Sequence, residues 1–190
     1  NEFKNKTVVI HNFIDNLKIK KYEKEDYIIN FGKFCKDKGT KTLLKVVKQL
    51  PNIKFIFAGY GPLENEFSKY ENIKFVGFKS GEELIELISK ARISIYPSEW
   101  YENCPFSVIE SQMYGTPVIG SNMGGIPELI DIGKTGEVFE AKNSDDLKNK
   151  ILELWNNKQK LEEYTKNCEH IKNETIDSYL KKIINLYKEN

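Results

Sequence analysis

Short apolar runs alternate with helix-like segments along most of the sequence, and this alternation constrains the fold more than any other feature. The runs are rich in β-branched and aromatic residues and have strand length: Tyr27–Phe31, Ile53–Ala58, Ile73–Val76, Ile93–Tyr96 and Pro117–Ile119. Between them lie segments of helical character: Gly39–Leu50, Leu63–Tyr70, Glu82–Lys90 and Phe106–Tyr114. Such alternation with short links predicts an α/β fold, a single doubly wound parallel sheet with helices on both faces.

The loops that follow the strands are where functional residues are expected. In a doubly wound sheet, ligands bind beyond the carboxyl ends of the strands. The corresponding loops are Gly32–Gly39, Gly59–Pro62, Gly77–Gly81, Pro97–Pro105 and Gly120–Pro127. Beyond them, three further helices are expected over Asp145–Asn156, with Ser144 as its N-cap, Lys158–Lys166 and Glu174–Lys188.

Composition excludes several classes of function. The 190 residues carry a net charge of +1, so charge implies neither nucleic acid nor an anionic membrane as partner. The three cysteines lack CxxC spacing, which favours a reduced, cytoplasmic protein. No signal peptide and no apolar run approaching the roughly 20 residues of a membrane span is visible. The sequence begins with Asn1 rather than methionine, which is consistent with a fragment.

Two glutamates in the segment 98–130 indicate a ligand with several hydroxyl groups. Glu102 lies in a loop after a strand, and Glu110 lies eight positions later inside the following helix. Two such carboxylates can hold a polyhydroxylated ligand at two points. The free N–H groups at the start of the helix can hold an anion at the same time. The pattern favours a sugar joined to a diphosphate.

The same segment resembles the donor-site signature of the retaining glycosyltransferases of family four, which have the two-Rossmann-domain GT-B fold. The signature is Glu-x7-Glu, a small residue, Gly-x-Pro-Val-Ile and Gly-Gly-x-x-Glu. It is matched here by Glu102, Glu110, Gly115, Pro117-Val118-Ile119, Gly124-Gly125 and Glu128. The resemblance implies that the chain is the C-terminal half of a GT-B fold, one Rossmann-like domain that binds the donor.

The resemblance also implies a division of the chain. Residues 1–26 would be an interdomain hinge and lead-in, and residues 27–172 the Rossmann-like domain that binds the nucleotide-sugar donor. Residues 173–190 would be a C-terminal helix that crosses to an N-terminal domain absent from this sequence. That absent domain would hold the acceptor.

Four residues are implied to act on the donor. Lys33 and Lys38 would neutralise the diphosphate and assist its departure, Glu110 would hold the ribose hydroxyls, and Glu102 the hydroxyls of the transferred sugar. Lys33 stands where the family usually has arginine; lysine keeps the charge but loses the planar bidentate fork.

Further contacts with the donor are implied in the neighbouring loops: Gly32, Gly59, Val76, Asn103, Cys104, Phe106 and Ser107. Pro105, which departs from the commoner family pattern, has no N–H to donate.

No metal and no cofactor are expected. The sequence contains no Asp-x-Asp, HExxH, CxxC or GxxxxGK[ST] motif. Lysines and a helix dipole would supply the positive charge instead. The donor would be a nucleotide-diphosphate sugar, with a UDP-sugar favoured over a GDP-sugar.

The resemblance implies transfer of a hexosyl group, with retention, to a glycan or lipid-linked acceptor. This chain alone would be inactive. The full-length protein would be cytoplasmic or peripheral at the inner face of the membrane, with contact to the membrane only through the missing half. Two alternatives remain open: a nucleotide-sugar 2-epimerase of the same fold, and a non-catalytic nucleotide-binding module.

Overall fold

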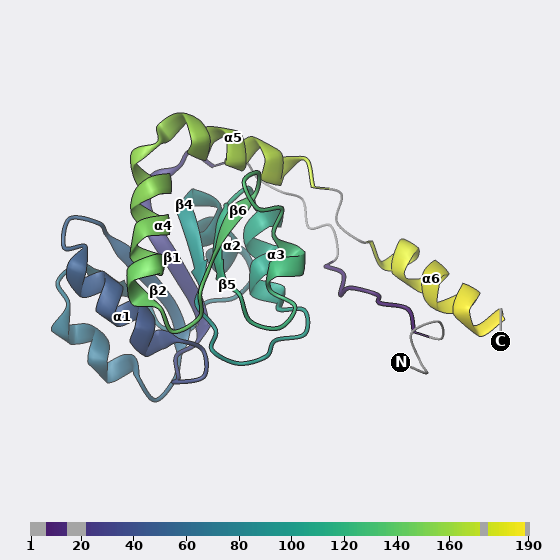
Figure 1. The fold of residues 1–190 in the computed structure, drawn as a ribbon, viewed down its shortest axis with the longest axis horizontal. Helices are drawn as coiled ribbons and strands as arrows, with labels where there is room; N and C mark the ends of the chain where they lie inside the picture. Colours follow the sequence, from purple (N-terminus) through teal and green to yellow (C-terminus); the bar gives the residue numbers. More distant parts are fainter. Residues whose placement is uncertain (1–6, 15–21, 172–174, 189–190) are drawn as a thin grey trace. The chain divides into compact units, whose positions relative to one another are not determined.

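A computed structural model describes residues 7–14, 22–171 and 175–188 of the chain. In the described residues, one sheet of six parallel strands forms the centre (Figure 1). The strands are β1 (Glu25–Lys33), β2 (Phe55–Tyr60), β3 (Ile73–Phe75), β4 (Ala91–Tyr96), β5 (Val118–Ser121) and β6 (Gly136–Phe139). Their order is β3-β2-β1-β4-β5-β6. The order reverses between β1 and β4, the point at which doubly wound sheets bind ligands.

Helices α1 (Thr40–Gln49) and α4 (Ser144–Asn156) cover one face of the sheet. Alternate strand residues point to this face, and Ile28, Phe57 and Ile95 join the fully buried cluster formed with the two helices. This cluster is the larger part of the core.

Helices α2 (Gly81–Lys90) and α3 (Phe106–Met113) pack against the strands on the opposite face. There the hydroxyl of Tyr27 donates to the carbonyl of Leu87 at 2.6 Å, and Val108 packs with Val118. A further helix, α5 (Lys158–Glu169), follows α4. The predicted doubly wound parallel sheet with helices on both faces is confirmed.

Strand β6 was not predicted from the sequence. It has only four residues, and its second, Glu137, is charged but buried. The hydroxyl of Tyr164 donates to Glu137 Oε1 at 2.6 Å, and the ammonium of Lys160 lies 2.9 Å from the same oxygen. Because a charged residue takes one of its buried positions, this short strand lacks the apolar pattern by which strands are predicted from a sequence.

Two local expectations need correction. The segment expected as helix at Leu63–Tyr70 forms a short 3₁₀ helix, η2 (Glu64–Lys69), and a second one, η3 (Pro127–Leu129), follows β5. The N-cap of α4 is Asn143 rather than Ser144, because the Asn143 side chain accepts from the N–H of Asp146 at 3.0 Å.

The chain divides into two compact units. One comprises residues 20–171 and contains the whole sheet; the other comprises residues 1–19 and 172–190. In the second unit, the rings of Phe13 and Tyr179 lie 4.9 Å apart, and α6 (Ile176–Lys188) has no buried residue. The expected hinge and C-terminal segment fall partly outside the described residues, at 1–6, 15–21, 173–174 and 189–190. The predicted domain boundaries stay predictions.

Candidate functional site

The loop between β1 and α1 lies directly against the loop that follows β4. Gly39, the residue before α1, has a φ of +67°, and a Cβ atom there would lie 1.7 Å from the carbonyl oxygen of Pro97. Only glycine allows this approach. The N–H of Glu99 also donates to the carbonyl of Asp37 at 2.8 Å. The contact brings Lys38, next to Gly39, beside the loop of Glu102.

Lys38 and Glu102 form an ion pair between their side chains. The Lys38 ammonium also lies 3.5 Å from the hydroxyl of Tyr96, and Ser98 Oγ donates to Glu102 Oε1 at 2.8 Å. Burial, and after it the Glu102 carboxylate, raises the pKa of Tyr96, so this hydroxyl stays protonated at neutral pH. The result is a compact polar cluster at the carboxyl end of β4.

The paired glycines after β5 hold the backbone of Glu102. The N–H of Gly125 donates to the Glu102 carbonyl at 2.7 Å. A Cβ atom at Gly124 would lie 2.3 Å from that carbonyl oxygen, and one at Gly125 would lie 1.9 Å from the Asn103 carbonyl. The Gly-Gly pair of the sequence pattern is therefore required by the close packing of two loops.

Two adjoining hollows lie at the carboxyl ends of β1, β2 and β4. They share Phe31, Gly32 and Ser107 as lining residues. The first, of about 120 Å³, is also lined by Asn30, Lys33, Lys38, Tyr96 and Pro97. The second, of about 190 Å³, is also lined by Ala58, Gly59, Tyr60, Phe78, Lys79, Leu84 and Glu110. One hollow thus offers two ammonium groups, and the other a carboxylate between aromatic and apolar side chains.

Glu110 faces the second hollow from α3, with Ile109 beside it buried in the core. Burial raises the pKa of its carboxyl group. On the opposite wall, a Cβ atom at Gly59 would lie 1.9 Å from the Gly32 carbonyl, so a larger residue would push the ends of β1 and β2 apart. The start of α3, at Ser107, adds the partial positive charge of a helix N-terminus between the hollows.

Residues 13–187 match the family model of the glycosyl transferases group 1. The chain belongs to this family. It resembles an uncharacterised glycosyltransferase of Methanocaldococcus jannaschii, with 33% identity over 165 residues, 82% of this chain and 46% of the relative. It also resembles an uncharacterised 41.2 kDa protein from the cps region of Klebsiella pneumoniae, with 31% identity over 80% of this chain and 44% of the relative. The chain therefore spans less than half the length of these two relatives.

Solved structures of glycosyltransferases share the fold of this group 1 chain. HepE of Anabaena in complex with UDP superposes with a TM-score of 0.78 at 19% identity, over 87% of this chain and 49% of HepE. TarM of S. aureus, in a complex that includes UDP, superposes with a TM-score of 0.80 at 24% identity, over 98% of this chain and 41% of TarM. The expected GT-B architecture is confirmed as far as this half of it extends.

Most of the predicted site residues of this group 1 chain converge on the two hollows. Gly32, Gly59, Lys33, Lys38, Ser107 and Glu110 line them directly. Glu102 is joined to the first hollow through Lys38. Asn103 and Cys104 lie in the loop before α3, and Phe106 is the half-exposed first residue of that helix. Their roles toward a donor stay predictions.

Val76 does not line either hollow. It follows β3, and its N–H donates to the carbonyl of Phe57 at 2.9 Å, which extends the sheet. Two residues later, Phe78 lines the second hollow instead, with its ring centroid 6.0 Å from that of Tyr60. The predicted contact of Val76 with the donor stays a prediction.

Several residues of the site have side chains that were not identified from the sequence, among them Tyr60, Phe78, Tyr96 and Ser98. Ser98 and Tyr96 could have been suspected, because they flank the loop that carries Glu102. Tyr60 is the last residue of β2 and Phe78 follows the neighbouring strand β3, and no local pattern indicates that their rings meet.

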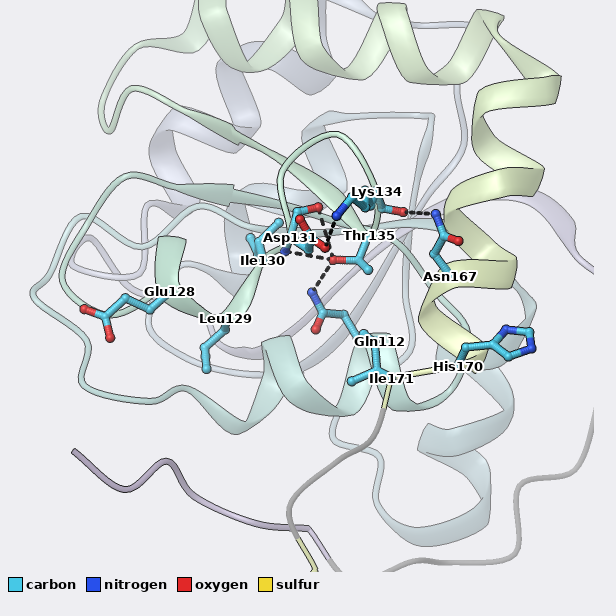
Figure 2. A pocket seen from close by; sticks show the side chains of 10 residues that line it. All are labelled: Gln112, Glu128, Leu129, Ile130, Asp131, Lys134, Thr135, Asn167, His170 and Ile171. Carbon is cyan, nitrogen blue, oxygen red and sulfur yellow. Dashed lines mark hydrogen bonds and ion pairs between the residues drawn. The ribbon is translucent and has the colours of Figure 1, made fainter. Parts of the chain in front are cut away.

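Another hollow, of about 430 Å³, lies between the end of α3, the segment 128–135 and the end of α5 (Figure 2). Its polar groups are largely paired with one another: Gln112 Nε2 donates to Thr135 Oγ1 at 3.2 Å, and Asn167 Nδ2 donates to the Lys134 carbonyl at 3.0 Å (Figure 2). Of the residues that match the donor-site signature, only Glu128 lines it, and none of the residues predicted to contact the donor does. Despite its larger volume, it is not the candidate site.

Within the described ranges, no group of three or more His, Cys, Asp or Glu side chains is arranged to hold a metal ion. The helices in the same ranges are each too short or too polar to cross a lipid bilayer.

Proposed function

We propose that this chain is the donor-binding half of a retaining glycosyltransferase and that the two adjoining hollows hold a nucleotide-diphosphate sugar. One observation carries the proposal: two lysines, a helix N-terminus and Glu110 converge where the strand order reverses. The complexes of HepE and TarM with UDP favour a uridine nucleotide.

Each part of the donor has a matching part of the site. The diphosphate would lie in the first hollow, between Lys33, Lys38 and the first N–H groups of α3. The ribose would bind through both its hydroxyls to the Glu110 carboxylate, and the base would lie near Phe78. Glu102 would accept hydrogen bonds from the hydroxyls of the transferred sugar.

In the proposed transfer, the bond between the anomeric carbon and the phosphate oxygen breaks as a bond to the acceptor hydroxyl oxygen forms on the same face. The proton of the acceptor hydroxyl moves to an oxygen of the departing diphosphate. The lysines stabilise the negative charge that develops on that leaving group. The charge of two ammonium groups and a helix N-terminus supports transfer without a metal ion.

The acceptor would be a glycan or lipid-linked hydroxyl, held by a further domain; the two relatives extend well beyond the part matched here. We therefore expect the 190-residue chain to bind a nucleotide but to transfer sugar poorly or not at all. Robust transfer by this chain alone would contradict that assignment of roles.

The deciding experiment is calorimetric titration with UDP, GDP and ADP, each with and without EDTA. It is repeated on Lys38→Ala and Glu110→Ala, with the exposed Glu163→Ala on α5 as the control. Binding of one nucleotide that survives EDTA, is weakened at least tenfold in both site variants and is unchanged in the control supports the proposal. Binding of no nucleotide, or equal binding by all variants, contradicts it.

A further inference from the structure

The ion pair between Lys38 and Glu102 places a carboxylate on one of the two ammonium groups that line the first hollow. The hollow is small, about 120 Å³, and Lys38 is a wall residue. A phosphate that enters it must share or take over the ammonium that Glu102 already holds. Glu102 and a phosphate group of the donor are thus alternative partners for the same cation.

We infer that Glu102 exchanges partners during the cycle and so discriminates the donor from the nucleoside diphosphate product. This rests on the proposed function. With the donor bound, Glu102 accepts hydrogen bonds from the sugar hydroxyls, and Lys38 serves the diphosphate. Once the sugar has left, Lys38 turns back to Glu102, which competes with the remaining diphosphate.

Glu102 is held in place independently of Lys38, which makes the exchange small. Ser98 is fully buried, and its Oγ donates to Glu102 Oε1 at 2.8 Å. The Glu102 carbonyl is fixed by the N–H of Gly125 at 2.7 Å. The carboxylate therefore stays at the rim of the hollow when Lys38 turns to a phosphate, and only the lysine side chain has to move.

The electrostatics of the two ligands differ at this point. The sugar of an intact donor brings hydroxyl groups that satisfy the Glu102 carboxylate, whose side chain is only 14% exposed to water. A free diphosphate brings an additional negative charge and no hydroxyl. Like charges close together in a partly buried site repel each other. Glu102 should therefore weaken binding of the product and not of the donor.

The test measures the affinities of UDP and UDP-glucose, together with GDP, ADP and their glucose conjugates, for the unaltered chain and for Glu102→Gln. Glutamine keeps the shape and removes the charge. We expect UDP to bind about fivefold more tightly to Glu102→Gln, a change of about 1 kcal/mol. UDP-glucose should bind equally well or more weakly, so that the preference for donor over product falls.

Glu99→Gln is the matched control, since Glu99 lies in the same loop and its carboxylate accepts from Thr42 Oγ1 at 2.6 Å rather than from Lys38. It should leave the ratio of the two affinities unchanged. In a Lys38→Ala background, the gain from Glu102→Gln should shrink, because the contested cation is gone. Thermal melting of every variant verifies that the fold is retained.

If UDP binds the unaltered chain but no more tightly to Glu102→Gln, the partner exchange is wrong and the proposed function stands. If no nucleotide binds to any variant, the proposed function fails and the inference fails with it. An equal gain in UDP affinity from Glu99→Gln would mean that removing any negative charge from this loop has the same effect. That result would also overturn the inference.

Discussion

Glu110 is the residue at which stability and the proposed function conflict. Burial on α3 raises the pKa of its carboxyl group, because the ionised form loses hydration. Because the pKa of this carboxyl is higher in the folded chain than in the unfolded chain, its protonated form contributes stability. That contribution is fully present at pH values below the unfolded pKa. It is lost as the pH rises through the folded pKa. At neutral pH the ionised carboxylate is therefore a cost, and we attribute its presence to ligand binding.

We predict that Glu110→Gln melts at a higher temperature than the unaltered chain at pH 7, with little difference near pH 4. The same change should weaken nucleotide binding at least tenfold, since the amide offers one uncharged acceptor oxygen where the carboxylate offers two charged ones to the ribose hydroxyls. Melting curves at both pH values and titration with UDP check the two effects, and Glu163→Gln on the exposed side of α5 is the control. A variant that is destabilised at pH 7 would contradict this account.

At the scale of elements, the site depends on contacts between loops that follow different strands. Gly39 is the point at which the β1–α1 loop meets the β4–α3 loop. We predict that Gly39→Ala costs more than about 2 kcal/mol of stability, from backbone strain at positive φ together with the overlap on Pro97. It should also displace Lys38 and lower nucleotide affinity.

Gly77→Ala separates these two causes. Gly77 has a φ of +69° but no neighbouring atom within 4 Å of an added Cβ, so only strain remains, about 1 kcal/mol. Denaturant unfolding of both variants provides the comparison. Equal losses of stability would mean that the packing of the two loops does not matter.

The buried charge on β6 is a second contact between elements, because Glu137 joins this strand to Tyr164 and Lys160 of α5 and Lys150 of α4. Burial opposes its ionisation, but the hydrogen bonds from Tyr164 and Lys160 and the two lysine charges together outweigh burial and lower its pKa. Stability from a depressed pKa is present above the unfolded pKa and is lost as the pH falls through the folded one.

We predict that Glu137→Gln destabilises the chain by about 2 kcal/mol at pH 7, because the half-buried ammonium groups of Lys150 and Lys160 lose the buried carboxylate that they share. The difference from the unaltered chain should begin to shrink as the pH falls below the ordinary glutamate pKa of about 4.3, and it should disappear only below the lower pKa of Glu137 in the folded chain. Urea unfolding at a series of pH values tests this, and a difference that is constant with pH would refute it.

At the scale of the whole molecule, the sheet, its core and the candidate site all belong to the unit 20–171. None of the residues of α6 is buried. We predict that a chain ending at Ile171 melts within about 3 °C of the unaltered chain, a shift that corresponds to less than 1 kcal/mol. Its affinity for UDP should also be unchanged. A large loss of either would show that the second unit supports the first.

The fold and much of the site were predictable from the sequence. The strands are rich in β-branched and aromatic residues, and the helices between them each have one apolar face. Few architectures bury all of these apolar surfaces, and a parallel sheet between two layers of helices is one that does. Within the string from Glu102 to Glu128, Glu102 and the pair Gly124-Gly125 lie in loops that follow strands, so their place at the carboxyl edge of the sheet could be inferred as well. The N-cap of α4 and strand β6 could not be predicted. Each depends on the contacts of one particular polar side chain, and the local pattern does not distinguish that side chain from the polar residues beside it.

The sequence by itself determined the fold class, the positions of the loops and the identity of the charged residues in them. Only the tertiary structure decided which of those residues meet. Lys38 and Glu102 are 64 positions apart, and they pair because β1 and β4 are neighbours in the sheet. Strand order arises from the packing of the whole core, so the contacts at the switch point have no signature in any one segment. The same reason explains the contact between the rings of Tyr60 and Phe78. It also explains the two hollows, which share Gly32 and Ser107 as lining residues.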